Sequence, residues 1–328
     1  MTDSLRHVQP GTGGITRRVA GRGFSYIAAN GKRISSEAFL GRVDALAIPP
    51  AWSDLWIARQ ANAHIQATGV DAAGRTQYLY HPRWRELRDW EKFIRSLAFA
   101  QRLPTIRRIV TRDLKQQEDS RRRALAAAVR LMDRAGLRVG GAAYAEENGS
   151  FGATTLQVRH VIVDNDGVTL KFRGKAERDW DVRIEDTVLR DYFVSVPHTP
   201  RSRPALGYFS RVGRSKQWQP VSDADVNSYL AVAAGPGFTA KDFRTWQGTA
   251  AAAIALAHSR KAGETSPEAV TAAIKIAAEW LHNTPSIAKE SYVNPRVVAL
   301  FEQGSVADLN RQKDRAVVTL LSGKADRK

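Results

Sequence analysis

The chain has 328 residues and a formal net charge of +17, with 50 lysines and arginines against 33 acidic residues. Such an excess favours a polyanionic partner, which binds by phosphate neutralisation and counterion release. Cysteine is absent, which excludes disulfides, a thiolate zinc site and a cysteine nucleophile and is compatible with the cytoplasm. No run approaches the ~20 apolar residues that cross a bilayer, and the basic residues are spread along the chain. Nucleic acid is therefore favoured over a membrane surface.

The first part of the chain predicts an antiparallel β domain. Residues 1–22 carry glycines and arginines without the apolar segment of a secretory signal, so we expect a flexible basic N-terminus. Between Gly23 and Tyr80, short apolar runs alternate with turn residues, beginning with a hairpin at Asn30-Gly31. We expect the β domain to span residues 23–90 and a larger, catalytic domain to span residues 91–328.

The larger domain is expected to be mainly helical. A charged helix should run from Trp84 to Leu103 and end at Pro104, and a second should run from Leu114 to Ala135 and end at Gly136. Apolar patterns then predict strands, at residues 155–158, 160–163, 168–172 and 181–184. From Asp186 onward the pattern is helical. The fold class is therefore α+β, with a small N-terminal antiparallel β domain and a larger helical domain that contains an inserted β-hairpin sheet.

Several familiar sites are absent from the sequence. Neither Lys32 nor Lys175, which each follow a glycine, belongs to the Gly-x-x-x-x-Gly-Lys-Ser/Thr pattern that cradles nucleotide phosphates. The seven histidines form no His-x-x-x-His pair, and no acidic cluster predicts a two-metal nuclease. Residues 164–167, Asp-Asn-Asp-Gly, lack the downstream ligand of a calcium loop and are interpreted as a turn between strands. We therefore expect no nucleotide and no metal cofactor.

One tyrosine and several basic residues could carry chemistry together. An Ala-rich helix over residues 267–280 leads to Thr284-Pro285, where the helix should break, and the turn that follows carries Tyr292. A phenol is a weak nucleophile until nearby cations stabilise its anion. The candidate cations lie where predicted elements begin or end: Arg138, Lys175, Lys241 and Arg244. Each of them alone is more often a solvated or phosphate-steering charge, and their combination with the tyrosine is the signal.

As an ordered set, these motifs resemble the type IB DNA topoisomerases, in particular their poxvirus-like and bacterial branch. The motifs are Leu137-Arg138-Val139-Gly140, Gly174-Lys175, Lys241-Asp242-Phe243-Arg244-Thr245 and the run from Asn283 to Tyr292, with Ile48-Pro49-Pro50-Ala51-Trp52 and the run from Gly74 to His81 in the N-terminal half. The match covers most of residues 23–305. Any one motif is weak, but the set is highly specific.

The resemblance implies a role for each residue. Tyr292 would attack a DNA phosphodiester to form a 3′-phosphotyrosyl enzyme, and Arg138 and Arg244 would stabilise the pentacoordinate phosphorane. Lys175 would protonate the 5′-oxygen that leaves. Strand rotation would then relax supercoils before religation, without ATP or metal. The implied partner is double-stranded DNA, bound by a monomer at the bacterial nucleoid.

One position departs from the poxvirus-type pattern, in which a histidine donates a hydrogen bond to a nonbridging phosphate oxygen. Alignment on Thr284-Pro285 places Asn283 at that position, and the histidine, His282, stands one residue earlier. An amide can also donate a hydrogen bond. We therefore predict that Asn283 is the donor and that His282→Ala has a mild effect.

The resemblance also implies contacts with DNA outside the catalytic set. In the β domain these are Gln77, Tyr78 and Tyr80, with Arg75 near the DNA backbone, and in the helical domain Lys241. Packing of the two tyrosines in the core is the alternative interpretation.

Two other functions remain open at this point. Tyrosine site-specific recombinases share the Arg, Lys, Arg and Tyr chemistry, but they typically carry His-x-x-Arg where this chain has Lys241-Asp242-Phe243-Arg244. They also generally place a helical clamp where we expect a β domain. The other alternative is a non-catalytic basic DNA-binding protein in which Tyr292 belongs to the core.

Overall fold

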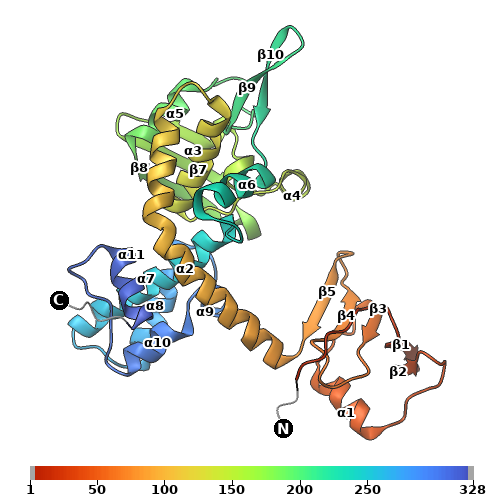
Figure 1. Ribbon diagram of the computed structural model, residues 1–328. Helices are drawn as coiled ribbons and strands as arrows, with labels where there is room; N and C mark the ends of the chain where they lie inside the picture. The colour runs from red at the N-terminus through yellow and green to blue at the C-terminus, as the bar shows by residue number, and fades with distance from the viewer. Residues whose placement is uncertain (1–3, 324–328) are drawn as a thin grey trace. The chain divides into compact units, whose positions relative to one another are not determined.

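The computed structural model describes residues 4–323 and has the mixed α+β fold that the sequence predicts (Figure 1). The chain divides into two compact units, residues 1–92 and 93–328. Helix α2 (Pro82–Lys115) begins in the first unit and continues into the second. Within residues 4–323, no helix is long and apolar enough to span a bilayer.

The first unit is built on a five-stranded antiparallel sheet. Its strands are β1 (Ile15–Ala20), β2 (Gly23–Ala28), β3 (Ser53–Ile57), β4 (Ile65–Val70) and β5 (Thr76–Tyr80), in the order β2-β1-β3-β4-β5. Val43 of helix α1 (Glu37–Ala45) packs against Leu55 and Ile57 in a small apolar core. Because β5 is last in the strand order, it is an edge strand, and one side of its backbone is unpaired within the sheet.

Strand β1 lies inside the segment expected to be flexible, so that expectation is wrong for residues 15–20. The strand pairs along its whole length with β2 and, through Ile15 and Thr16, with β3. Ile15 is buried in the core of the unit, and its burial outweighs the polar character of the arginines that follow. The turn at Asn30-Gly31 is present, because Ile27 bridges Arg33 across it.

The second unit combines helices with two small sheets. The helices after α2 are α3 (Ser120–Ala135), α4 (Ala142–Asn148), α5 (Thr187–Ser195), α6 (Asp223–Ala234), α7 (Ala240–Lys261), α8 (Pro267–Trp280), α9 (Pro285–Ser291), α10 (Pro295–Glu302) and α11 (Lys313–Ser322). The strands are β6 (Val161–Val163), β7 (Gly167–Arg173) and β8 (Asp179–Glu185) in one antiparallel sheet, and β9 (Gly207–Val212) and β10 (Ser215–Pro220) in a separate hairpin. Helices α3 and α7 supply much of the buried core.

Some predicted boundaries in this unit are wrong. Helix α2 continues through Pro104 to Lys115, because Leu103, Ile106 and the apolar residues that follow are buried and outweigh the hydrogen bond that proline removes. The next helix begins only at Ser120, after Asp119 caps it. Residues 153–155 and 158–160 form single 3₁₀ turns rather than the first predicted strand. The β9–β10 hairpin lies where helices are expected.

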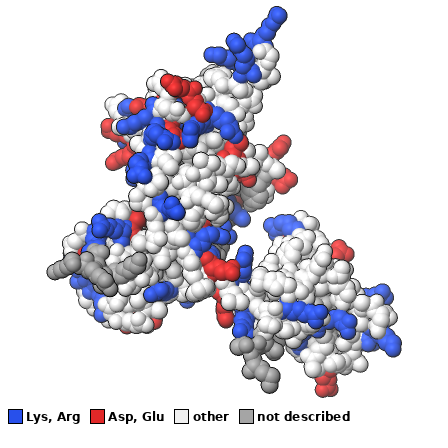
Figure 2. Space-filling view, in the orientation of Figure 1, with Lys and Arg blue, Asp and Glu red and all other residues white. Residues whose placement is uncertain are grey.

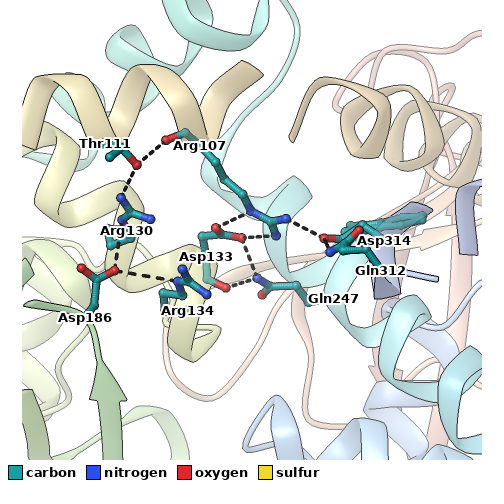
Figure 3. A network of polar contacts seen from close by, with 10 residues as sticks. Arg107, Thr111, Arg130, Asp133, Arg134, Asp186, Gln247, Gln312 and Asp314 are labelled. Atoms are coloured by element: carbon teal, nitrogen blue, oxygen red, sulfur yellow. Dashed lines mark hydrogen bonds and ion pairs between the residues drawn. The ribbon is translucent and has the colours of Figure 1, made fainter. Parts of the chain in front are cut away.

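A polar network ties the helices of the second unit together (Figure 3). Arg107 of α2 pairs with Asp133 of α3 at 2.8 Å and with Asp314 of α11 at 2.6 Å. Gln247 of α7 donates a hydrogen bond to the Asp133 carbonyl. Removing one member of such a buried set would leave the others uncompensated. The network therefore fixes the end of α3 relative to α7, and both helices deliver residues of the candidate site.

Candidate active site

Four of the predicted catalytic residues meet where the end of α3, helix α7 and the α8–α9 connection come together. Arg138 Nη2 donates a hydrogen bond to Asn283 Oδ1 at 2.8 Å. The Arg244 guanidinium carbon lies 5.1 Å from the ring centroid of Tyr292. Residues separated by more than 150 positions in the sequence thus form one cluster of two guanidinium groups, an amide and a phenol.

Arg244 is fixed from both sides by the backbone. It is 3% exposed, and its two terminal nitrogens donate to the carbonyl of Gly136 and, at 2.8 Å, to that of Leu281. Gly136 ends α3 in the left-handed conformation, with φ of 65°, as its sequence position predicts. A side chain at this position would strike the Trp280 ring. The turn that ends α3 is therefore shaped to hold Arg244 and to place Arg138 two residues later.

The α8–α9 connection is only four residues long, residues 281–284. His282 has φ of 49°, its N–H donates to Glu279 O, and the Asn283 N–H donates to Ala278 O at 2.9 Å. This is the Schellman pattern of a helix end, with histidine at the position that glycine usually occupies. Thr284 then caps α9 and Pro285 opens it. The break that Thr284-Pro285 predicts is present, and the segment after it is a short helix.

Asn283 has one hydrogen-bonding group in use and one unused. The residue is 7% exposed, and its side-chain carbonyl oxygen accepts a hydrogen bond from Arg138. Its Nδ2 is buried and has no hydrogen-bond partner in the part of the chain described. A buried donor without a partner is unfavourable by about 1–3 kcal/mol. This donor is therefore available to an oxygen of a bound ligand beside Arg138.

Tyr292 follows the last residue of α9, and helix α7 fixes its backbone. Thr249 Oγ1 donates to the Tyr292 carbonyl at 2.8 Å and accepts from the Asn294 N–H at 3.0 Å. A Cβ at Gly248 would lie 2.9 Å from the Tyr292 Cβ, so only glycine lets the two segments approach this closely. Gly248 and Thr249 were not among the predicted site residues. Their signal in the sequence was weak, because a glycine and a threonine within an Ala-rich helix also suit close helix packing.

The cations around Tyr292 change its acidity. Burial raises the pKa of the phenol, but the charges of Arg244, Arg138 and Lys241 outweigh it, and the pKa lies below its ordinary value. Burial and the nearby Arg138 charge lower the pKa of Arg244 to about 10, so the guanidinium remains charged at neutral pH. Lys241 is exposed one turn before Arg244 on α7. The site therefore favours the phenolate, the reactive form of a tyrosine nucleophile.

Lys175 lies in the loop between β7 and β8, and its side chain is exposed. The indole of Trp180, in β8, packs against the backbone of Gly174, where a Cβ would lie 2.4 Å from Trp180 Nε1. The Trp180 ring also stacks on that of His282, with centroids 3.8 Å apart and planes at 18°. The loop that carries Lys175 is thus attached to the residue that precedes Asn283. Trp180 was not predicted as a site residue.

The candidate DNA contacts of the first unit lie on and beside β5. Tyr78 is 45% exposed, and its ring stacks on that of Tyr80 with centroids 6.0 Å apart. Tyr80 also packs partly against the cluster around Trp56. Gln77 and Arg75 both bind the carboxylate of Asp71, at 2.9 and 2.8 Å. Because strand side chains alternate, Gln77 faces away from the two tyrosines.

The described residues include no group of three or more His, Asp or Glu side chains that could hold a metal ion. The site is instead a set of cations and neutral donors around a phenol. Such an arrangement suits stabilisation of a developing negative charge on phosphorus-bound oxygens.

Comparisons with known proteins identify the family of the chain. Residues 81–317 match the model of the family described as "Eukaryotic DNA topoisomerase I, catalytic core", and residues 23–71 match that of the "Bacterial DNA topoisomerase IB, N-terminal domain". The chain is 27% identical over 317 residues to the DNA topoisomerase 1B of Acanthamoeba polyphaga mimivirus, an alignment that covers 94% of this chain and 93% of the viral protein. The first match covers more than two thirds of the chain and contains all five predicted catalytic residues, so the chain belongs to the type IB DNA topoisomerase family.

Proposed function

We propose that this protein relaxes supercoiled DNA by cutting one strand through Tyr292, which forms a 3′-phosphotyrosyl bond, and by resealing the strand after it has rotated. The observation that carries the proposal is the position of the Tyr292 ring beside the buried Arg244, with the pKa of the phenol lowered. Family membership makes DNA the substrate.

Each residue of the site has a step in this mechanism. The phenolate oxygen of Tyr292 attacks phosphorus, and negative charge accumulates on the nonbridging oxygens. Arg138 and Arg244 neutralise this charge, and Asn283 Nδ2, the donor without a partner, binds one of the oxygens. The O5′–P bond then breaks, and Lys175 gives a proton to the leaving oxygen.

Resealing is the reverse of cleavage. The free 5′-hydroxyl attacks the phosphotyrosine, Lys175 takes up the proton, and Tyr292 leaves as the phenolate. Because one phosphodiester replaces another, the reaction needs no ATP. Arg138, Arg244 and Asn283 supply the charge stabilisation, so we expect it to need no metal ion. One tyrosine cuts one strand, so a monomer is sufficient. We assign the chemistry to the domain of residues 91–328, assign DNA contacts to residues 23–90, and place the activity at the bacterial nucleoid.

The decisive experiment is relaxation of a supercoiled plasmid in EDTA without ATP. We expect the wild type to relax the plasmid and to form protein–DNA adducts that survive SDS, and Tyr292→Phe to do neither while still binding DNA. Exchange of strands between two duplexes would instead indicate a recombinase. A wild-type protein that binds DNA but forms no adduct would indicate a non-catalytic DNA-binding protein.

A further inference from the structure

The β9–β10 hairpin carries an unneutralised basic surface. Arg211, Arg214 and Lys216 are exposed on it, and among residues 4–323 no ion pair or hydrogen bond joins their side chains to another group. The chain contains no acidic residue from Tyr192 to Ser222. Figure 2 shows the resulting group of basic side chains on the projecting hairpin that Figure 1 labels β9 and β10.

The charge pattern is unfavourable for the hairpin itself. Arg211 lies directly opposite Lys216 in the ladder, so the two side chains occupy the same face of the hairpin. Like charges at directly opposite positions destabilise an antiparallel pair, and this sheet has no third strand to compensate. A structural role therefore does not explain these residues, whereas an anionic partner that lies across both strands does.

The same face has aromatic residues at its base. Phe209 and Trp218 are directly opposite each other, with ring centroids 5.3 Å apart, and Phe209 is 48% exposed. Trp218 Nε1 donates to Pro204 O at 3.1 Å, and the guanidinium of Arg203 lies 5.9 Å from the Trp218 ring. The base is thus anchored to the body of the unit, while the outer part of the hairpin presents its cations to solvent.

We propose that the β9–β10 hairpin is an arm that binds the phosphate backbone of duplex DNA outside the cleavage site. The proposal rests on DNA being the substrate, as in the proposed function. Within the second unit the hairpin lies far from helix α9, which leads to Tyr292 (Figure 1). The arm therefore adds affinity through DNA flanking the cleaved phosphodiester, and it has no part in the chemical step.

The test removes the three charges, with Arg211→Gln, Arg214→Gln and Lys216→Gln combined. A matched control removes three cations that are paired with carboxylates, by Arg88→Gln, Lys171→Gln and Lys275→Gln. Both variants lose the same net charge. Binding to a long linear duplex is measured over a range of salt concentrations, with Tyr292→Phe in the background so that binding stays reversible.

We expect the hairpin variant to lose about 0.9 from the slope of log K against log salt for each phosphate contact removed, and the control to lose less. We also expect the melting temperature of the hairpin variant to be no lower than that of the wild type. Equal slopes for the hairpin variant and the control would overturn the proposal. So would loss of binding to phosphatidylserine vesicles with an unchanged DNA slope, which would make the hairpin a membrane contact.

Lys216→Glu distinguishes an effect of charge on DNA binding from an effect on the stability of the hairpin, because it places a glutamate directly opposite Arg211. It should weaken DNA binding although the hairpin gains a favourable pair, and unchanged binding would count against the arm. The SDS-stable adduct of the wild type is measured independently. If that adduct forms and the slope of log K against log salt does not change in the hairpin variant, the proposal of a DNA-binding arm is wrong and the proposed function stands. If no adduct forms, the proposed function fails whatever the slopes.

Discussion

Asn283 is held by its carbonyl oxygen and is free to donate through its nitrogen. Arg138 occupies the oxygen at 2.8 Å, and the buried Nδ2 has no partner in the described chain. Loss of one donor to a transition-state oxygen typically slows a reaction about 10²–10³-fold, or roughly 2.7–4 kcal/mol. We predict this loss for Asn283→Ala in single-turnover cleavage and religation, with DNA affinity nearly unchanged.

Two further substitutions at this position separate the donor from the acceptor. Asn283→Asp keeps an oxygen for Arg138 but loses the N–H group, so it should be as slow as alanine. Asn283→His restores a donor and should retain much of the activity. If Asn283→Ala were silent and His282→Ala severe, the phosphate donor would be the histidine and the alignment on Thr284-Pro285 would be wrong.

The acidity of Tyr292 depends on Arg244. Burial alone would raise the pKa of the phenol, and the surrounding cations lower it below its ordinary value of 10.0. Arg244→Gln removes the cation that contributes most to this lowering of the pKa and leaves the burial of the phenol in place. We therefore predict that the pKa of Tyr292 rises in this variant, while Arg244→Lys, which keeps a charge, shows a smaller rise.

Absorbance titration near 295 nm measures this shift, after subtraction of the same variant with Tyr292→Phe. In the wild type the cleavage rate should increase with pH and level off below the pH at which an ordinary tyrosine ionises, because the phenolate is the attacking form. In Arg244→Gln the increase should move to higher pH. An unchanged ionisation midpoint in Arg244→Gln would show that the guanidinium does not set the acidity of the nucleophile.

At the scale of elements, helix α7 both carries Arg244 and positions Tyr292. Arg244 and Gly248 lie one turn apart on the same face, and a Cβ on Gly248 would come within 2.9 Å of both the Tyr292 Cβ and Leu281 Cδ1. Gly248→Ala should push Tyr292 away from Arg244. A displacement of about 1 Å can slow a reaction about 10²-fold, so we predict a loss of between tenfold and a hundredfold in cleavage with little change in DNA affinity.

Gly41→Ala is the matched control for this substitution. Gly41 also lies in a helix, α1, but its Cβ would meet no atom within 4 Å. The control should be fully active and slightly more stable, because alanine is the better helix former. A fully active Gly248→Ala would mean that the two segments can separate without consequence for the chemistry.

The sequence singled out four residues that the fold brings together, whereas several of the elements that hold them differ from the prediction. Gly136, the Asp164–Gly167 turn and helix α8 carry local signals, and these features are present. Pro104 misled the prediction because burial along α2 is a tertiary effect that no local rule contains. The β9–β10 hairpin has polar, basic strands without strong apolar alternation. The role of Gly248 depends on Tyr292, 44 positions later, so the pairing was invisible before the fold was known.

The stack of Trp180 on His282 joins two elements that carry predicted catalytic residues. It attaches the β7–β8 loop, which carries Lys175, to the turn before Asn283. His282 keeps a left-handed conformation, which costs roughly 1–3 kcal/mol for a residue other than glycine. The stack gives a reason for histidine rather than glycine at this position. We infer that it positions Lys175, the proposed general acid.

The stack changes the mild effect expected from the sequence: His282→Ala, like Trp180→Leu, should slow cleavage about tenfold, a part of the 10²–10⁴-fold that a general acid contributes. A substrate with sulfur in place of the 5′-bridging oxygen tests the cause, because a thiolate leaves without protonation. On this substrate both variants, and Lys175→Ala, should recover wild-type rates, whereas Asn283→Ala should not. Persistent slowness of His282→Ala on the sulfur substrate would assign the stack a different role.

At the scale of the whole molecule, the proposed chemistry and part of the proposed DNA affinity belong to different units. All five predicted catalytic residues belong to the second unit, while Arg75, Tyr78 and Tyr80 belong to the first. The net charge of +17 predicts an affinity that falls steeply with salt, by about 10³–10⁵ between 50 and 200 mM if 6–10 phosphates are contacted.

A fragment of residues 81–328, which contains the whole catalytic-core match, should therefore still form the SDS-stable adduct through Tyr292. It should bind DNA more weakly than the full chain and with a smaller salt slope, because the phosphate contacts of the first unit are missing. Tyr78→Ala in the full chain should reproduce part of the loss in affinity without lowering the melting temperature. A fragment that folds, as judged by circular dichroism, but forms no adduct at saturating DNA would show that the first unit takes part in the chemical step.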